Sequence, residues 1–456
     1  MLLPKSPKEI AARLSAFWKL RKAIFTRVPM AIGLLLTIGC CVYLNTSYTV
    51  SAEDALMSRM VYLKNKWLKI KPEKQRDILF INTGKDLSLV DDTADFGQVV
   101  ISDRYKIYTL LRAIQRAADK PAFVLLDLQF YYHNQLSIDD NIQHKVTQSG
   151  LQSFYADPAI DDSLRQVIAD IKNLAITVVT KDNQIQYPLF KAAYGLADYR
   201  TFGTEITKFQ LHYPEYSTLS IPALLNERLD HENNEKRWPL HWSFCRFLRF
   251  NYVYPSYYAI DKNLDDPHYQ FYSIGSLVQL KDDNLIGSMV KDKLVVIGNF
   301  EGDQHRSPNG SMAGSIILSD IYLGLLNDKQ YTSVLWLFFV FVFFTTMGYY
   351  TLRPQTQYEP CLKLSGNRFC RFSKYVINDI FYRLKKKIVA RTFLLALFSS
   401  VSIVLFNQPV YIFAPLLLLS LIDYFVNKRY RHPYPETACP KQKTDENRNV
   451  SQKTAL

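Results

Sequence analysis

Short apolar runs alternate with amphipathic stretches along residues 77–326, and this alternation predicts the fold of the segment. Four runs are compact and rich in Val, Ile, Leu and Phe, which is typical of buried strands. They are Asp77–Asn82 (DILFIN), Pro121–Phe130 (PAFVLLDLQF), Ala175–Thr180 (AITVVT) and Lys293–Gly298 (KLVVIG). Because helical patterns follow the strands, we expect an α/β domain with a mostly parallel sheet that helices cover on both faces.

The helical patterns between the strands have clear apolar faces. Their apolar residues recur at steps of three and four, which places them on one side of a helix. They are Ile107, Leu110, Leu111 and Ile114 within Tyr105–Lys120, and Leu164, Val167, Ile168 and Ile171 within Asp161–Asn173. Asp161 or Asp162 is available as the N-cap of the second helix. A further helix is expected at Ser315–Leu326, a short one near Pro222–Leu229, and extended pieces around Leu248–Tyr254.

Four longer apolar stretches predict transmembrane α-helices. Each is long enough to cross a bilayer when aromatic ends and tilt are taken into account. They are residues 28–44, 333–350, 392–406 and 409–426. The first lacks a small-residue cleavage site, which favours a signal anchor over a removable signal peptide.

The net charge of +13 invites a nucleic-acid hypothesis, but the distribution of charge argues against it. Residues 1–27, 351–391 and 427–456 together hold 24 of the 55 Lys and Arg residues, and residues 45–332 are mildly acidic. Basic flanks beside apolar spans are the positive-inside pattern. We therefore expect a multi-pass protein of the bacterial inner membrane, with both termini and 351–391 in the cytoplasm and 45–332 outside. No nucleic-acid partner is expected.

The segments that flank the spans have patterns of their own. Residues 1–27 predict a basic amphipathic helix on the inner membrane face, and the basic loop 351–391 predicts a surface-lying helix. Residues 427–456 are polar without apolar periodicity, which indicates a disordered cytoplasmic tail. After the first span a heptad-like stripe follows, formed by Leu56, Met60, Leu63, Trp67 and Ile70. It either pairs with a second copy or packs on its own domain, and we favour packing.

The sequence offers few enzyme motifs. No phosphate-binding loop, zinc-protease motif, nucleophile elbow or dinucleotide fingerprint is present, and the eight histidines show no metal-ligand spacing. Asp303, His305 and Ser307 alternate, but neighbours two apart in a loop do not readily form a catalytic relay. We therefore expect a protein that is not an enzyme, with no catalytic residues, cofactor or metal.

A binding function is better supported, at the edge of the predicted sheet. In a parallel sheet, ligands lie beyond the carboxyl ends of the strands. Arg104, Asp127, Asp303 and His305 follow or end three of the predicted strands, so we expect them to gather at one edge as a candidate ligand site. The structural alternative, which we favour, is that Arg104 pairs with Asp127 or Asp303 and locks the loops.

The loop GDQHRSPNGSMAG (Gly302–Gly314), which holds Asp303 and His305, also contains residues expected to form turns and close packing. These are Pro308, Gly310 and Gly314. The run KLVVIGNFEGDQHRSPNGSMAGSIILSDIYLGLL resembles the closing motif of the type-two CHASE domain, an extracellular sensory domain associated with cyclases and histidine kinases. That motif is a core strand ending in IG, then D-x-x-x-[ST]-P-x-G-x-x-x-G, then a helix. The residues that match are Asp303, Ser307, Pro308, Gly310 and Gly314.

The resemblance extends over residues 77–326. ILFINTGKDLSLVD resembles the opening strand and turn, SDRYKIYTLLRAI the arginine-led first helix with Arg104, and FVLLDLQF the second strand with Asp127. LADYRTFGTEITKFQLHYPEYSTLSIPALL resembles the middle stretch, LRFNYVYP the piece before the last strand, and the membrane helices that follow are also typical of the family. The chain departs from the pattern at Thr83 and at Ser319–Asp320.

The resemblance implies a membrane-bound extracytoplasmic sensory protein. Family members usually continue into an output enzyme, and only about thirty polar residues follow Val426, so we expect a separate effector at the membrane or in the cytoplasm. The expected partners outside are an unknown small ligand or an envelope protein, and a homodimer is left open. The alternative is a structural or scaffold subunit of an envelope complex. A transport subunit is disfavoured because the spans hold almost no ionisable groups.

Overall fold

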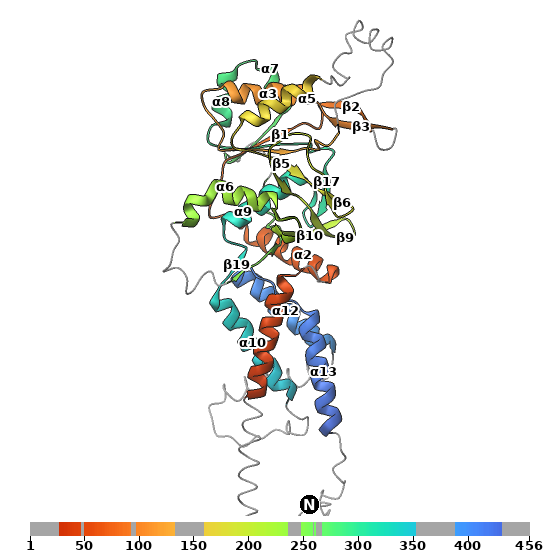
Figure 1. Cartoon of the computed structure of the whole chain (residues 1–456). Coiled ribbons are helices and arrows are strands. Elements are labelled where there is room, and N and C mark those ends of the chain that lie inside the picture. The colour runs from red at the N-terminus through yellow and green to blue at the C-terminus, as the bar shows by residue number, and fades with distance from the viewer. Residues whose placement is uncertain are drawn as a thin grey trace, which may run out of the picture. The chain divides into compact units, whose positions relative to one another are not determined.

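The chain has a mixed α/β fold with a parallel sheet and helices (Figure 1). The computed structural model describes residues 27–46, 50–92, 97–132, 159–235, 248–258, 260, 267–352 and 388–430. The larger of two compact units comprises Gly33–Phe344 and Thr392–Phe413. It contains the whole sheet, and the contacts described below lie within it unless stated otherwise.

Six parallel strands form the central sheet, in the order β15–β1–β16–β4–β5–β8. The strands are Tyr269–Ser273 (β15), Ile78–Asn82 (β1), Leu294–Gly298 (β16), Phe123–Asp127 (β4), Leu174–Val178 (β5) and Ala193–Leu196 (β8). The four strands predicted from apolar runs are confirmed and occupy the interior of the sheet. The edge strands β15 (YQFYS) and β8 (AYGL) were not predicted, because neither is an apolar run.

Helices cover both faces of this sheet, as predicted. The helices on one face are α3 (Arg104–Arg116), α5 (Ala159–Asp170), α7 (Ile274–Gln279) and α8 (Asp283–Val290). On the other face lie α6 (Ile221–Glu235) and α9 (Gly314–Leu326), and every residue of α9 is buried. The expected capping role of Asp161 or Asp162 is wrong, because both lie inside the first turn of α5.

A second, smaller sheet has the order β14–β10–β17–β18, with β9 also paired to β10. Its strands are Tyr252–Val253 (β14), Glu205–Gln210 (β10), Gln304–Ser307 (β17), Gly310–Ala313 (β18) and Tyr199–Phe202 (β9). The stretch Gly302–Gly314, expected as an open loop, is therefore mostly a β-hairpin. Pro308 lies in its turn, as expected, and Gly310 begins its second strand.

Helix α2 (Ser51–Leu68) packs against β9 and β10, and it contradicts one expectation. Most of the stripe expected to pack on the domain points outward, with Leu56, Leu63 and Trp67 exposed by 42%, 39% and 76%. Only its last member, Ile70, packs against the core. The buried face instead contains Ser58 and Asn65. These side chains hydrogen-bond to the domain, so the inner face is more polar than the outer one and apolar periodicity pointed to the wrong side.

Apolar helices lie on both sides of the α/β domain in the sequence. Among the described residues two helices are long and apolar enough to cross a membrane, Arg27–Leu44 and Val334–Leu352 (α10). The other two predicted spans correspond to α12 (Ile388–Phe406) and α13 (Phe413–Tyr430), whose apolar parts are shorter. The indole of Trp336 in α10 donates to the Ser402 hydroxyl of α12 at 2.8 Å.

The smaller unit comprises residues 1–32, 345–391 and 414–456. Within it, the guanidinium of Arg391 pairs with the Asp423 carboxylate at 2.8 Å, and both side chains are largely buried. The predictions for 1–26, for most of 351–391 and for 431–456 lie outside the described residues.

The remaining elements are short, and most of them form two-stranded sheets. They are β2 (Leu87–Asp92) with β3 (Gly97–Ser102), β6 (Thr180–Lys181) with β7 (Gln184–Ile185), β11 (His212–Tyr213) with β12 (Thr218–Leu219), β13 (Leu248–Arg249) with β19 (Tyr331–Thr332), and the 3₁₀ turn η2 (Pro214–Tyr216).

Asp320, at one of the departures from the CHASE pattern, is a structural residue of α9. Its carboxylate accepts the backbone N–H groups of Ser256, Tyr257 and Tyr258 at 2.7, 2.9 and 2.8 Å. The extended segment after β14 is thereby fixed to the core helix, because buried N–H groups must find an acceptor.

Candidate functional site

A cavity of about 880 Å³ lies beyond the carboxyl ends of the central strands. Arg104, Asp127, Asp303 and His305 all line it, so the four residues selected from the sequence do gather at one edge of the sheet. The edge is level because β1, β16 and β4 end in register, with Gly298 beside both Asn82 and Asp127. This is where a parallel sheet is expected to bind a ligand.

Asp127 is held at the end of β4 by a hydroxyl from α9. Ser315 donates to its carboxylate at 2.5 Å. A Cβ at position 298 would overlap the Ser315 hydroxyl, so the final residue of β16 must be glycine for α9 to approach Asp127 this closely. The sequence run IG at the end of β16 thus has a direct role in forming the site.

Asp303 and His305 belong to the hairpin that follows β16. The imidazole Nε2 of His305 lies 2.9 Å from the Asp303 carboxylate. The backbone N–H of Gly314 donates to the Asp303 carbonyl at 3.0 Å, and a Cβ at position 314 would overlap the Asp303 carboxylate. Tyr199 of β9 closes the group, with its ring centroid 5.0 Å from that of His305 and its hydroxyl donating to the Gly314 carbonyl.

The two carboxylates give this edge an acidic character. Burial, reinforced by the nearby charge of Asp303, raises the pKa of Asp127 to about 6. The hydrogen bond with Asp303 raises the pKa of His305 above its ordinary value. Among the described residues no group of three or more His, Cys, Asp and Glu side chains could hold a metal ion. The arrangement is suited to binding a polar ligand.

Arg104 lines the cavity, but its charge is already compensated. Its guanidinium pairs with Asp161 of α5 at 2.5 Å and donates to the Tyr132 carbonyl. The rings of Phe130 and Phe190 lie 5.8 Å from the guanidinium carbon. The expected pairing with Asp127 or Asp303 is wrong. The structural role itself is retained, because the Arg104–Asp161 pair joins the first turns of α3 and α5.

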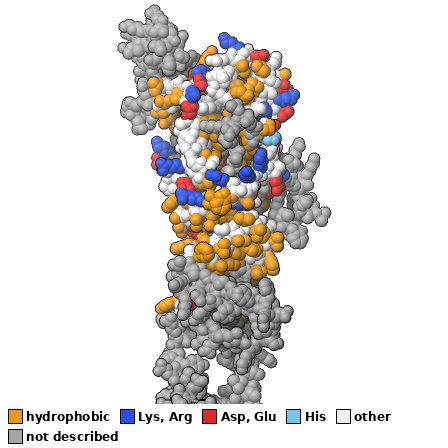
Figure 2. Space-filling view, turned by 180° about the vertical axis from the view of Figure 1, so that it is seen from behind, with side chains coloured by type: hydrophobic (Ala, Val, Ile, Leu, Met, Phe, Trp, Pro, Cys, Tyr) orange, Lys and Arg blue, Asp and Glu red, His pale blue; other side chains and the backbone are white. Residues whose placement is uncertain are grey.

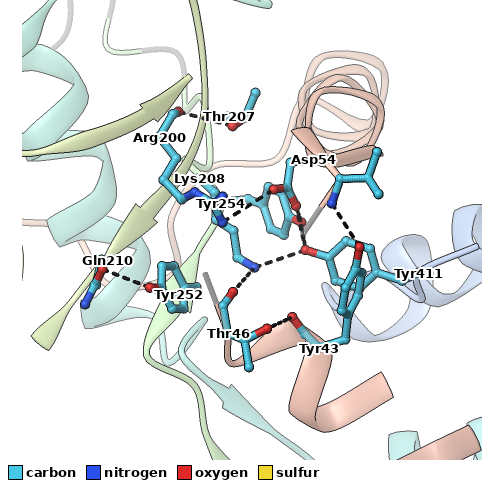
Figure 3. A network of polar contacts seen from close by, with 11 residues as sticks. Tyr43, Thr46, Asp54, Arg200, Thr207, Lys208, Gln210, Tyr252, Tyr254 and Tyr411 are labelled. Carbon is cyan, nitrogen blue, oxygen red and sulfur yellow. Dashed lines mark hydrogen bonds and ion pairs between the residues drawn. The ribbon is translucent and has the colours of Figure 1, made fainter. Parts of the chain in front are cut away.

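A second polar cluster, which the sequence did not reveal, joins the domain to the turn between α12 and α13 (Figure 3). The Asp54 carboxylate of α2 accepts the hydroxyls of Tyr411 and Tyr254 at 2.6 and 2.9 Å. The Lys208 ammonium is fully buried and donates to the Tyr411 hydroxyl at 3.1 Å. Burial lowers the pKa of Lys208 to about 8.

Glu53 holds the same turn from the neighbouring position. Its carboxylate accepts the backbone N–H groups of Ile412 and Phe413. Farther along α2, the Lys64 ammonium donates to the Ile403 carbonyl and to the Asn407 side chain. Acidic residues in the first turn of an amphipathic helix normally face solvent. The burial of Glu53 and Asp54 was therefore not predictable from the sequence.

The two strands β9 and β10 connect the cavity with this second cluster. Successive side chains of a strand point to opposite sides, and Tyr199 and Thr201 line the cavity while Arg200 approaches Asp54 at 4.0 Å. Arg200 and Lys208 are paired across the two strands. Two like charges on neighbouring strands repel each other, and Asp54 compensates both.

No protein-family model, curated protein or solved structure matches this chain.

Replacing Asp161 by Ala should destabilise the protein by about 3–5 kcal/mol, because it leaves the buried Arg104 guanidinium without its partner. Asp303→Ala should cost less than about 1 kcal/mol, since that side chain is 44% exposed. Thermal unfolding of the full-length protein in detergent measures both, with Asp162→Ala on the exposed face of α5 as the matched control. Equal losses for Asp161→Ala and Asp303→Ala would refute the assignment of the ion pair.

Asp127→Asn should stabilise the protein above pH 7. The pKa of Asp127 in the folded state, about 6, lies above the usual 3.8, so the stability that its protonated form contributes is complete below about pH 4 and lost as the pH rises through 6. Asparagine avoids the buried charge and still accepts from Ser315. With allowance for partial solvent access, we expect a gain of about 1–2 kcal/mol at pH 7.5.

The measurement is thermal unfolding across pH. The gain should vanish near pH 4, where wild-type Asp127 is itself neutral. Asp162→Asn, which removes a surface carboxylate, should behave like wild type at both pH values. A gain from Asp127→Asn that does not depend on pH would contradict the raised pKa.

Proposed function

We propose that this chain is a multi-pass protein of the bacterial inner membrane, with residues 45–332 as an extracytoplasmic sensory domain. In this proposal the edge cavity binds a small ligand, and the domain transmits the bound state to its membrane helices and to a separate effector. The resemblance of residues 77–326 to the type-two CHASE domain supports the class of function. The structure contributes three supporting observations.

The first observation concerns the surfaces of the four apolar helices, which carry large hydrophobic side chains facing outward. They are Leu34, Leu35, Ile38 and Val42; Leu335, Phe338 and Val342; Phe393, Leu397, Val401, Val404 and Leu405; and Leu417, Leu421, Tyr424 and Phe425. On the face seen in Figure 2, hydrophobic side chains gather in one continuous area at the lower end of the described surface, whereas charged side chains are spread above it. A contiguous apolar surface of this kind is typical of contact with lipid.

The second observation concerns α12 and α13, whose apolar parts are short for a span. As complete helices of 19 and 18 residues they extend roughly 27–29 Å, close to the thickness of a hydrocarbon core. Arg391 of α12 and Asp423 of α13 neutralise each other. Pairing is how ionisable groups in membrane helices are usually accommodated. Both helices therefore suit a bilayer.

The third observation carries the sensory part of the proposal: β9 presents adjacent residues to the two sites. Tyr199 contacts His305 in the cavity wall, and Arg200 approaches Asp54, which holds the turn between α12 and α13. A ligand that displaces the hairpin bearing His305 would therefore move β9 and alter the contacts of that turn. The coupling element in this proposal is the pair β9 and β10, whose two faces are engaged at different sites.

The charges around the cavity favour a ligand that carries positive charge. Asp127 and Asp303 face the cavity without a compensating cation other than His305 among the described residues that line it, because Arg104 is engaged by Asp161. A ligand ammonium near both carboxylates would relieve their mutual repulsion. Amines are therefore the class of compound to test first.

The topology is tested with reporter fusions in the full-length chain. Gly203 lies in the turn between β9 and β10 with open space around it, so an insertion there should be tolerated. We expect an extracytoplasmic reporter signal at Gly203 and a cytoplasmic one at the C-terminus. A cytoplasmic signal at Gly203 would overturn the whole proposal.

Ligand binding and its transmission are tested together on the purified full-length protein. We expect at least one of putrescine, spermidine, choline and arginine to raise the Tm, and the rise to be lost in Asp303→Asn, because ligand stabilisation follows occupancy. The same compound should change hydrogen exchange at Ile412 and Phe413, whose N–H groups Glu53 holds.

Arg200→Ala is the variant that separates binding from transmission. It should keep the rise in Tm and lose the change in exchange, while Arg165→Ala on the exposed face of α5 should keep both. Absence of a thermal shift with every amine, or a shift that survives Asp303→Asn, would count against the cavity as an amine site.

The second candidate function is a structural or scaffold subunit of an envelope complex. The observation that favours it is the β2–β3 hairpin, which exposes Leu89 by 39% and Val100 by 56%. Binding of an envelope protein that Leu89→Glu abolishes, without any response to small ligands, would favour this function over sensing, because Leu89 does not line the cavity.

A further inference from the structure

The outward face of α2 has an apolar stripe that no described residue covers. Leu56, Met60, Leu63 and Trp67 are spaced by four, three and four residues, so they lie within about 60° of one another around the helix. Trp67, with 76% of its surface exposed, is the most exposed large hydrophobic residue among those described. A row of this kind on a helix that is otherwise well anchored calls for an apolar environment.

The opposite side of α2 is fixed to the α/β domain. The hydroxyls of Ser58 and Tyr257 are 2.9 Å apart, and the Asn65 side chain donates to the Ser256 carbonyl. Between this side and the stripe, the fully buried Met57 accepts from the Ser399 hydroxyl of α12 through its sulfur at 3.3 Å. These contacts fix the rotation of the helix about its own axis, and with it the direction in which the stripe points.

The order of side chains around α2 shows what lies next to the stripe. At 100° per residue, Glu53 and Lys64 lie roughly 50–70° to one side of its centre, and both contact the ends of α12 and α13 that face the domain. Arg59 and Lys66 lie to the other side and are exposed. The stripe therefore borders the side of α2 that contacts α12 and α13. It lies opposite the side that contacts the α/β domain.

The charges near the end of α2 match an anionic lipid surface. Lys66, Lys69 and Lys71 are exposed and lie within four residues of Trp67. Trp is enriched at the headgroup level of bilayers, and amphipathic helices that lie on membranes combine an apolar face with Lys and Arg at its border.

We propose that α2 lies on the outer surface of the membrane, with Leu56, Met60, Leu63 and Trp67 inserted between lipid headgroups and Lys66, Lys69 and Lys71 facing phosphates. This inference rests on the membrane placement proposed above. The helix that anchors the turn between α12 and α13 would then also be in contact with lipid, so the sensory domain is seated on the bilayer through α2.

The experiment is site-specific photo-crosslinking of the full-length protein in vesicles of phosphatidylethanolamine and phosphatidylglycerol. A benzophenone amino acid replaces Leu63, Trp67 or, as the matched control, Leu285, which is 44% exposed on α8 at the far side of the sheet. Phe338, 61% exposed on α10, serves as the reference for a lipid-facing residue. Adducts are identified by mass spectrometry as phospholipid or as protein.

We expect phospholipid adducts at positions 63 and 67 in at least about tenfold higher yield than at 285, because lipid is within reach only at the membrane surface. Adducts between two copies of the chain at positions 63 and 67 would overturn the inference in favour of a dimer interface. Lipid adducts at 338 but none at 63 or 67 would overturn it while leaving the membrane placement intact. The absence of lipid adducts at 338 as well would overturn the placement on which it rests.

Discussion

The adjacent carboxylates of Glu53 and Asp54 are the acceptors on which the junction between the α/β domain and the last two helices depends. The turn between α12 and α13 presents two backbone N–H groups and the Tyr411 hydroxyl to a buried position, and each finds its acceptor in the first turn of α2. A buried donor without an acceptor would cost about 1–3 kcal/mol. The location of α2, and of the strands β9 and β10 against which it packs, follows from this requirement.

The sequence predicted those parts of the fold whose residues are nearly all apolar. The central strands β1, β16, β4 and β5 are buried on both faces and are therefore apolar along most of their length, so they were predicted as strands of a mostly parallel sheet. A parallel sheet in turn predicted that Arg104, Asp127, Asp303 and His305 gather at one edge. The partner of Arg104 was not predictable, because Asp161 and Asp162 are equivalent in the pattern and only the packing of α5 on α3 selects one. Lys208 was missed for a related reason: a buried lysine is identical in sequence to a solvated one, and its partners Thr46 and Tyr411 lie 162 and 203 residues away.

The carboxylates of the domain differ in how fully their charge is compensated, and this distinguishes the positions that hold the fold from the one proposed to bind a ligand. Asp161 has an arginine, and Asp320 has three backbone N–H groups. Asp127 has the Ser315 hydroxyl and a second carboxylate nearby, in a cavity beyond the ends of the strands. A site that retains an uncompensated charge sacrifices stability for the ability to bind, which is the usual relation between active positions and their surroundings.

The connection between α12, which ends at Phe406, and α13, which begins at Phe413, also constrains the order in which the protein is made. Asn407 and Gln408 are followed by a segment whose donors are satisfied by Glu53 and whose tyrosine is held by Asp54 and Lys208, all synthesised at least 203 residues earlier. During synthesis from the N-terminus, the partners for this turn come together only once α2, which carries Glu53 and Asp54, has packed on β10, which carries Lys208. The contacts that fix the last helical pair can therefore form only after the domain residues that supply them have been synthesised.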